Sequence, residues 1–277
     1  MKKLLLAGLM AFSFSAFSQS YVILSNGVLL TTDKAGFVYD LVQYVNPYKI
    51  RINGGNYLVN DERLFTVSSD GFYYEKDFKI KKIRGKGLNY MLDNDGDLIA
   101  IAADGTFVKY DESGKELKKA HRFGGNFFLV LKDKKKNIVD LYSVNDKAAY
   151  FKLNVPGLNP ADISVLGGNY FMANGKLFTV SSSGVVFEKS SFYIPALKKM
   201  GGNFFVDSMN RIWTVSEEGI LSNPALPLSF NLSNIEKFGS NYMIDTEGVI
   251  YTIDSKGNMN ARTMEFHDVR NAKILSN

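Results

Sequence analysis

The chain of 277 residues contains 45% hydrophobic and 13% aromatic residues, no cysteine, and a formal net charge of +5. This composition is typical of a globular protein and excludes a disordered chain, a disulfide scaffold and any site built on thiolates. Only two histidines, His121 and His267, could join carboxylates as ligands, so we expect neither a metal nor a cofactor.

The first predicted element is a secretory signal over residues 1–18. Two lysines precede an apolar run from Leu4 to about Phe14, and small residues, Ala16 and Ser18, stand just before Gln19. The run is too short for a membrane anchor, and no cysteine follows it for lipid attachment. The alternative is a buried N-terminal helix. We expect a bacterial protein that is periplasmic or secreted and is not an integral membrane protein.

The rest of the chain repeats itself. GGNYLVNDERLFTVSSDG (54–71) and GGNYFMANGKLFTVSSSG (167–184) agree at eleven of 18 positions. Further copies bring the number of units to seven, each anchored on an aromatic residue 33 to 43 positions after the last. The anchors are Tyr21, Tyr57, Tyr90, Phe127, Tyr170, Phe204 and Tyr242. Such self-similarity indicates a repeat architecture.

Each unit contains short alternating apolar runs separated by turn residues, the pattern of antiparallel strands. In the second unit we expect strands over Tyr57–Val59, Leu64–Ser68, Phe72–Lys76 and Ile80–Arg84. Four strands in each of seven units predict an all-β, seven-bladed β-propeller of four-stranded antiparallel blades, forming one domain over 19–277. A solenoid would need shorter, mostly parallel coils with capping ends.

The two ends of the chain support a closed ring. NAKILSN (271–277) aligns with NIEKFGSN (234–241), the stretch that leads into Tyr242. The strand that should follow is supplied by the mature N-terminus with Tyr21. Pairing of the N- and C-terminal strands would remove the exposed edges of an open sheet.

Two repeated features have a structural interpretation. The asparagines after the glycines suit the passage from an outer strand of one blade to the inner strand of the next, and the aromatic anchors suit packing between blades. The alternative is a ring of polar ligands. Asp93, Asp95 and Asp97 suggest a calcium loop, but Gly96 is misplaced for one and other units put a hairpin turn there.

Two stretches resemble known propeller repeats. DSMNRIWTVSEEGIL (207–221) resembles the repeat of periplasmic sensor propellers, and DGDLIAIAADGTFVKYDESGKEL (95–117) is similar to PQQ-like repeats. Each resemblance covers about one blade and implies the fold. No residue matches the cofactor ligands of the PQQ-like enzymes, so the resemblance implies neither a cofactor nor catalytic residues here.

Charge is the one feature that breaks the repeat. The segment 79–136 holds 14 Lys and Arg against 8 Asp and Glu, whereas the rest of the mature chain is net negative. We predict a basic binding patch, pooled from turns of adjacent blades, that attracts an anionic partner. The alternative is that these cations only protect sheet edges. The patch residues are Lys115, Lys118, Lys119, Arg122, Lys132, Lys134, Lys135 and Lys136.

For function we predict a non-enzymatic binding scaffold that engages a protein or an anionic envelope glycan through one face or the rim. We expect a monomer and no nucleic acid partner. The alternative is a hydrolase or lyase acting on envelope carbohydrate, and a third hypothesis is an assembly factor at the outer membrane. No catalytic motif is present to identify an enzyme, and a propeller fold alone implies no activity.

Overall fold

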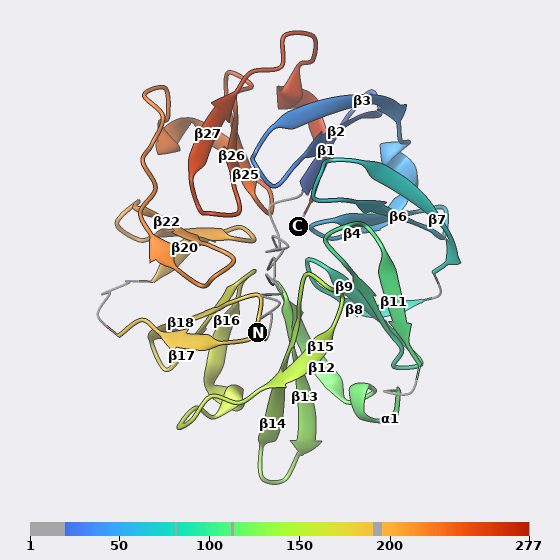
Figure 1. The fold of residues 1–277 in the computed structure, drawn as a ribbon, viewed down its shortest axis with the longest axis vertical. Helices are drawn as coiled ribbons and strands as arrows, with labels where there is room; N and C mark the ends of the chain where they lie inside the picture. Colours follow the sequence, from blue (N-terminus) through green and yellow to red (C-terminus); the bar gives the residue numbers. More distant parts are fainter. Residues whose placement is uncertain (1–19, 81, 112–113, 191–195, 277) are drawn as a thin grey trace, which may run out of the picture.

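The computed structural model describes residues 20–80, 82–111, 114–190 and 196–276. Within them, 28 strands form seven four-stranded antiparallel sheets arranged in a ring (Figure 1). The chain is an all-β, seven-bladed β-propeller, as the repeat count predicted. The predicted signal over 1–18 lies outside the described residues.

Blades 1 to 4 are each one sheet of four strands. Blade 1 contains β28 (Ala272–Leu275), β1 (Ser20–Leu24), β2 (Val28–Thr32) and β3 (Val38–Tyr44). Blade 2 contains β4 (Ile50–Asn53), β5 (Tyr57–Asn60), β6 (Arg63–Val67) and β7 (Tyr73–Lys79). Blade 3 contains β8 (Ile83–Lys86), β9 (Tyr90–Asp93), β10 (Leu98–Ile101) and β11 (Phe107–Tyr110). Blade 4 contains β12 (Ala120–Gly124), β13 (Phe127–Asp133), β14 (Ile138–Val144) and β15 (Tyr150–Leu153).

Blades 5 to 7 follow the same order. Blade 5 contains β16 (Ile163–Leu166), β17 (Tyr170–Ala173), β18 (Lys176–Val180) and β19 (Val186–Glu188). Blade 6 contains β20 (Leu197–Met200), β21 (Phe204–Asp207), β22 (Ile212–Val215) and β23 (Leu221–Ser222). Blade 7 contains β24 (Ile235–Phe238), β25 (Tyr242–Asp245), β26 (Ile250–Ile253) and β27 (Met259–Arg262).

Short helices lie in several connections between blades. They are α1 (Gly114–Leu117), η1 (Pro47–Lys49), η2 (Pro160–Asp162), η3 (Leu232–Asn234) and η4 (Val269–Asn271). Each η helix begins after an Asn or Asp whose side chain accepts a hydrogen bond from the backbone N–H two residues on. These capped turns direct the chain from the last strand of one blade to the first strand of the next.

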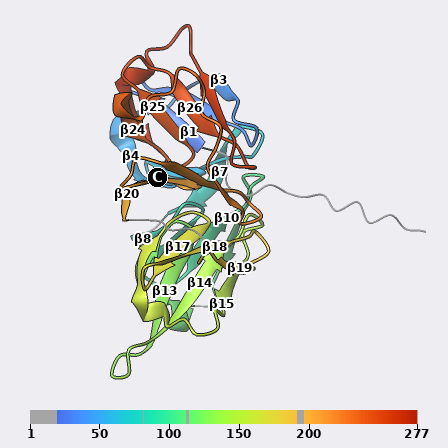
Figure 2. The same cartoon turned by 90° about the vertical axis from the view of Figure 1, so that its left-hand side faces the viewer.

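The four strands of a blade follow one another from one face of the ring to the other. Figure 2 shows first strands such as β4, β8, β20 and β24 on one side and fourth strands such as β3, β7, β15 and β19 on the opposite side. We call these sides the first-strand face and the fourth-strand face. The strands run from the axis towards the rim, as β13 and β14 do in Figure 1. Two turns of each blade therefore lie at the axis: a first axial turn between strands one and two, and a second axial turn between strands three and four.

The predicted grouping of strands was wrong by one strand. Ile80–Arg84 was expected to close the second blade, but β8 (Ile83–Lys86) pairs with β9 and belongs to blade 3. The Gly-Gly-Asn segment is therefore a turn inside one sheet and not a passage between blades. Gly54 illustrates the reason, because its N–H donates to the carbonyl of Tyr57 at 2.8 Å and closes the chain reversal locally.

The core is divided among the contacts between blades. Each of the seven neighbouring pairs of blades shares one cluster of buried apolar side chains. The seven aromatic anchors are completely buried, which confirms their predicted packing role. Trp213 is 5% exposed, and its Nε1–H donates to Asp207 at 3.0 Å. A blade alone cannot bury its faces, so stability depends on the complete ring.

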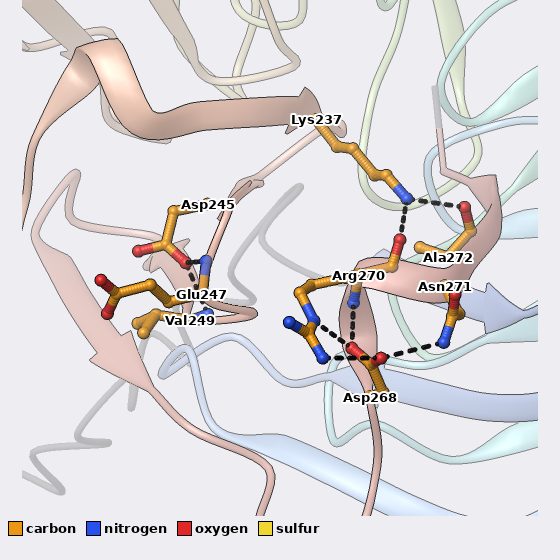
Figure 3. Close-up of polar contacts among 8 residues, drawn as sticks. All are labelled: Lys237, Asp245, Glu247, Val249, Asp268, Arg270, Asn271 and Ala272. Atoms are coloured by element: carbon orange, nitrogen blue, oxygen red, sulfur yellow. Dashed lines mark hydrogen bonds and ion pairs between the residues drawn. The ribbon is translucent and has the colours of Figure 1, made fainter.

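The ring closes through the chain termini, as predicted. β28 pairs with β1, with Ile274 opposite Ile23. Figure 3 shows the adjoining contact: Lys237 on β24 of blade 7 donates to the carbonyls of Arg270 in η4 and Ala272 at the start of β28. Asp268, which caps η4, accepts from the Arg270 side chain, and this hydrogen bond holds the pKa of Asp268 below its ordinary value.

The acidic turn after β9 is a hairpin, as expected. The Asp93 Oδ1 accepts from the backbone N–H groups of Asp95 and Asp97, both at 2.9 Å. The carboxylate thus organises its own turn between β9 and β10.

Candidate functional site

Both sets of axial turns are joined from blade to blade by backbone hydrogen bonds. Among the first axial turns, the N–H of Leu88 donates to Gly125 at 2.7 Å, and that of Gly168 donates to Gly202 at 2.7 Å. Among the second axial turns, Ser69 donates to Ala103 at 2.6 Å. The axis is therefore bordered by backbone near each face.

Two kinds of side-chain hydroxyl, from tyrosine and from threonine, donate further hydrogen bonds between neighbouring blades. The anchor Tyr21 donates to the carbonyl of Tyr57 at 2.7 Å, and Tyr242 closes the ring by donating to Tyr21 at 3.0 Å. Threonines of the third strands do the same near the other face, as Thr66 donates to Gly105 at 2.7 Å. The repeated Tyr and Thr therefore explain much of the internal similarity of the sequence.

The asparagines of the first axial turns are structural, but not at the predicted passage between blades. Asn56, Asn89 and Asn126 are at most 4% exposed. Their Nδ2 groups donate to neighbouring blades, for example from Asn89 to the carbonyl of Asn145 at 3.0 Å. Asn56 and Asn89 thereby connect the two levels of axial turns, whereas Asn126 donates to Asn169 in the first axial turn of blade 5 at 3.0 Å.

The fourth-strand face carries exposed aromatic side chains. Alternation along the strand produces them: Tyr73 packs into the cluster between blades 1 and 2, while Phe72 and Tyr74 on either side are 56% and 41% exposed. Phe37 and Tyr39 occupy the same positions in blade 1, at 51% and 39%. Val185 and Phe187 occupy them in blade 5, at 51% and 39%. We call this set the aromatic arc.

Each of several aromatic rings of this face lies against the second axial turn of the following blade. A Cβ on Gly71 would lie 2.9 Å from the Tyr39 ring, and one on Gly105 would lie 3.2 Å from the Tyr74 ring. Phe187 contacts Gly219 in the same way. The residues before these glycines are Asp70, Asp104 and Glu218. An exposed ring is thus repeatedly packed against an axial turn of the next blade that contains an acidic residue.

Basic side chains lie over the same rings. Lys76 Nζ is 4.7 Å from the centre of the Tyr74 ring, and Lys189 Nζ is 5.0 Å from that of Phe187. Arg262 of blade 7 lies 4.8 Å from Phe37 of blade 1. These contacts stabilise the rings weakly, by ~0.5–1 kcal/mol each at exposed sites, and add hydrogen-bond donors beside them.

A small cavity of about 240 Å³ opens between the second axial turns of blades 3 and 4. Its lining consists of Ala102, Ala103, Asp104, Thr106, Asp146 and Lys147. On the first-strand side, a cavity of about 260 Å³ is bordered mainly by glycines of the first axial turns with Leu88, Leu166 and Met200. The cavity between blades 3 and 4 therefore carries the greater variety of polar groups.

The structure places the eight predicted patch residues in blade 4 and the segment leading into it. Lys115 lies in α1, and Lys118 and Lys119 are exposed between α1 and β12. Lys134, Lys135 and Lys136 form the exposed turn between β13 and β14 at the rim. The expectation that adjacent blades would pool these charges was wrong, because α1 leads directly into the first strand of the same sheet.

Two of the patch residues have structural partners. Lys132 pairs with Glu116 and lies 3.4 Å from the Asp140 carboxylate. Arg122 donates to the carbonyls of Ile163 and Ser164 in blade 5. Arg122 thereby covers the free edge of a first strand, which is the alternative role suggested for such cations. For Lys134–Lys136 no ion pair is present in the described part of the chain.

Neither the aromatic arc nor Asp146 was expected from the sequence. A signal for the arc is present, since an aromatic residue stands one and three positions after Gly36 and Gly71. For Asp146, the only signal is that Ala148 replaces the turn glycine of the other units.

No helix in the described ranges is long and apolar enough to cross a membrane. The two histidines lie apart: His121 is on β12, and His267 pairs with Asp40 at 2.6 Å beside blade 1.

No protein-family model and no curated protein sequence matches the chain. Solved propeller structures are similar to it. A virginiamycin B lyase from Staphylococcus aureus is 13% identical, with a TM-score of 0.35, over 91% of this chain and 98% of the lyase. The extracellular domain of a hybrid two-component system from B. thetaiotaomicron is 13% identical, with a TM-score of 0.30, over 92% of this chain and 39% of that chain. At such identities the likeness concerns the fold alone.

Proposed function

We propose that the chain is an exported, non-enzymatic scaffold that binds an envelope glycan on its fourth-strand face. Residues 1–18 would be removed on export, leaving residues 19–277 as one domain. The observation that carries the proposal is the repeated packing of an exposed aromatic ring against an axial turn of the next blade that contains an acidic residue.

The chemistry of this arrangement fits a saccharide. The C–H face of a sugar ring packs against an aromatic ring, and its hydroxyls donate to a neighbouring carboxylate while accepting from a lysine. Tyr39 with Asp70, and Tyr74 with Asp104 and Lys76, offer this combination in successive blades. A set of similar subsites in a repeating protein matches a ligand built from repeating units. Exposed apolar groups with a polar surround are typical of binding surfaces.

The basic turn would contribute to the attraction of an anionic glycan. The exposed Lys134, Lys135 and Lys136 are concentrated in one rim turn of blade 4. Their field would raise the local concentration of a polyanion without a specific contact, and salt would weaken it.

The test is a survey of bacterial envelope oligosaccharides with the mature protein, followed by calorimetric titration of those that bind. The double variant Tyr39→Ala/Tyr74→Ala should bind at least about tenfold more weakly, equivalent to roughly 1.4 kcal/mol. Phe266→Ala is the matched control, because Phe266 is 90% exposed in the connection after β27 and lies outside the arc. Equal affinity of the double variant and the control would refute the proposed surface.

The same mixtures separate binding from catalysis. A scaffold leaves the oligosaccharide intact, whereas a hydrolase or lyase shortens it. Mass spectrometry after prolonged incubation should therefore return only the starting ligand. Shortened products that depend on the protein would replace the scaffold by the hydrolase or lyase alternative.

A further inference from the structure

The second axial turn of blade 4 departs from the turns of the other blades. Six blades place a glycine with positive φ at its fourth position: Gly36, Gly71, Gly105, Gly184, Gly219 and Gly257. Blade 4 has Ala148 there, at a φ of 59° and completely buried. A left-handed conformation is unfavourable for a residue with a Cβ, and such positions are concentrated at functional sites. This turn therefore differs from its counterparts in sequence, and its backbone conformation is energetically less favourable because Ala148 carries a Cβ.

Asp146 is the second departure in the same turn. Its side chain borders the 240 Å³ cavity, although the residue is only 5% exposed. In the described chain, no side chain donates a hydrogen bond to its carboxylate and no ion pair reaches it. Burial raises the pKa of Asp146, partly offset by the charge of Lys147 and by nearby backbone N–H groups. A buried Asp without a side-chain partner is rare, because desolvation of the charge is costly.

The rest of the cavity supplies complementary groups. Thr106 donates from its backbone and its hydroxyl to the same oxygen of Asp104, at 2.8 and 2.6 Å, which leaves the other oxygen for an outside donor. Lys147 adds a cation, and Ala102 and Ala103 provide a small apolar surface. The Tyr74 ring stands at the edge, against Gly105.

This composition favours a neutral, hydroxyl-rich group over an ion. Asp104, Asp146 and Lys147 sum to a formal charge of −1, which disfavours an anion, and no group of three potential metal ligands is present among the described residues. Together these side chains offer several acceptors and one donor, which suits hydroxyl groups. The volume is below the ~300–1,000 Å³ of sites for drug-sized ligands. The cavity therefore suits one unit of a larger ligand, with the neighbouring aromatic arc available for the next.

We infer that this cavity is a subsite for one hexose-sized sugar residue, with two of its hydroxyls donating to Asp146 and Asp104. The inference rests on the proposed function and deepens it, because it names the position that recognises an individual sugar unit. It also gives the Asp146 carboxylate a role, since a ligand hydroxyl would add to the backbone N–H groups a donor that no side chain of the described residues supplies.

The probe is a free hexose, with glucose, galactose and mannose each tested at millimolar concentration by saturation-transfer NMR. The parent protein should show saturation transfer with at least one of the three. Asp146→Asn should reduce the affinity at least tenfold, because a neutral amide accepts a hydroxyl more weakly than a carboxylate. Asp162→Asn is the control, since Asp162 is an exposed residue of η2. Absence of transfer with every hexose, or equal transfer with Asp146→Asn, would overturn the inference.

A second readout needs no ligand. If Asp146 is a binding group that the fold tolerates at a cost, Asp146→Asn should raise the melting temperature of the free protein. If the carboxylate is instead a structural group, the variant should melt earlier than the parent, which would overturn the inference.

The outcomes for the two proposals are separable. Oligosaccharide binding that depends on Tyr39 and Tyr74 but not on Asp146 would leave the proposed function standing and refute the subsite. Hexose binding that depends on Asp146, without any oligosaccharide binding to the arc, would refute the proposed function and retain the subsite.

Discussion

Gly125→Ala tests whether the ring is held together by backbone contacts at the axis. Gly125 lies in the first axial turn of blade 4 at a φ of +55°, and an added Cβ would overlap the carbonyl of Gly167 in blade 5. Two separate effects should lower the free energy of unfolding: the left-handed backbone conformation of an alanine and the steric clash of its Cβ. A control variant that has only the first effect is needed.

Gly175→Ala provides that control. Gly175 has a φ of +73° in the hairpin between β17 and β18, and nothing lies within 4 Å of a Cβ placed there. A left-handed alanine costs ~1–2 kcal/mol, of which ~0.4–1 kcal/mol is returned because the unfolded chain loses freedom. We expect Gly175→Ala to destabilise the protein by about 1 kcal/mol or less.

Gly125→Ala adds the displacement of neighbouring backbone. Separating the turns of blades 4 and 5 breaks the bond from Asn126 N–H to Gly167 at 3.3 Å and strains that from Leu88 N–H to Gly125 at 2.7 Å. Each lost bond costs ~0.5–1.5 kcal/mol, and a buried group left without a partner costs ~1–3 kcal/mol. The total destabilisation should be roughly 3–5 kcal/mol.

Thermal and urea unfolding of the parent and the two variants measures the difference. At ~2–4 °C per kcal/mol for a chain of this size, Gly125→Ala should lower the melting temperature by roughly 10 °C. Gly175→Ala should lower it by no more than a few degrees. Equal effects of the two substitutions would refute the reasoning, because only conformation would then matter at the axis.

Four further predictions concern the closure, the core, the rim and acid stability. Deleting residues 273–277 removes most of β28 and should cost several kcal/mol in urea unfolding; an unchanged midpoint would contradict closure through the termini. Trp213→Ala should cost roughly 3–5 kcal/mol, as for other buried aromatics, and the parent's tryptophan fluorescence should resist quenching by iodide. Replacing all of Lys134–Lys136 with Gln should remove most of the salt-sensitive binding to anionic glycans, while the melting temperature stays within ~1–2 °C of the parent's. Unchanged binding at every salt concentration would show that these lysines serve only solubility. The hydrogen bond from His267 lowers the pKa of Asp40, so above about pH 5 Asp40→Asn should be less stable than the parent by under ~1 kcal/mol. This difference in the free energy of unfolding should disappear as the pH falls through the lowered pKa of Asp40. A difference that stays constant from pH 5 to pH 2 would exclude the linkage.

The assignment of strands to blades could not be predicted from local sequence patterns. The Gly-Gly-Asn segment can reverse the chain within a sheet or carry it to another sheet, and the residues are suitable for both. The choice depends on the backbone bond from Gly54 to Tyr57 and on the partner of β8, which is β9. These are contacts between segments, so the alternation of apolar residues could not distinguish the two arrangements.

The basic cluster shows the same limit for a binding surface. Its residues are recognisable from charge alone, yet Arg122 is engaged with carbonyls of blade 5, and Lys132 with Glu116 and Asp140. The Lys134–Lys136 turn projects at the rim, and Lys118 and Lys119 are exposed, as a charge count implies. Partners that come from another strand or blade decide which cations are available to a ligand.

The sequence by itself determined the number of blades, the antiparallel strands and the closure of the ring. These follow from short-range patterns, because a blade buries the same faces each time and so repeats the same residues. Tertiary structure alone decided that Asp146 is buried beside a cavity and that Tyr39 and Tyr74 lie against the next blade's turns. Burial and contact depend on what the neighbouring blade places opposite a residue, and that information lies about 30 to 40 positions away in the chain, at the spacing of the repeat.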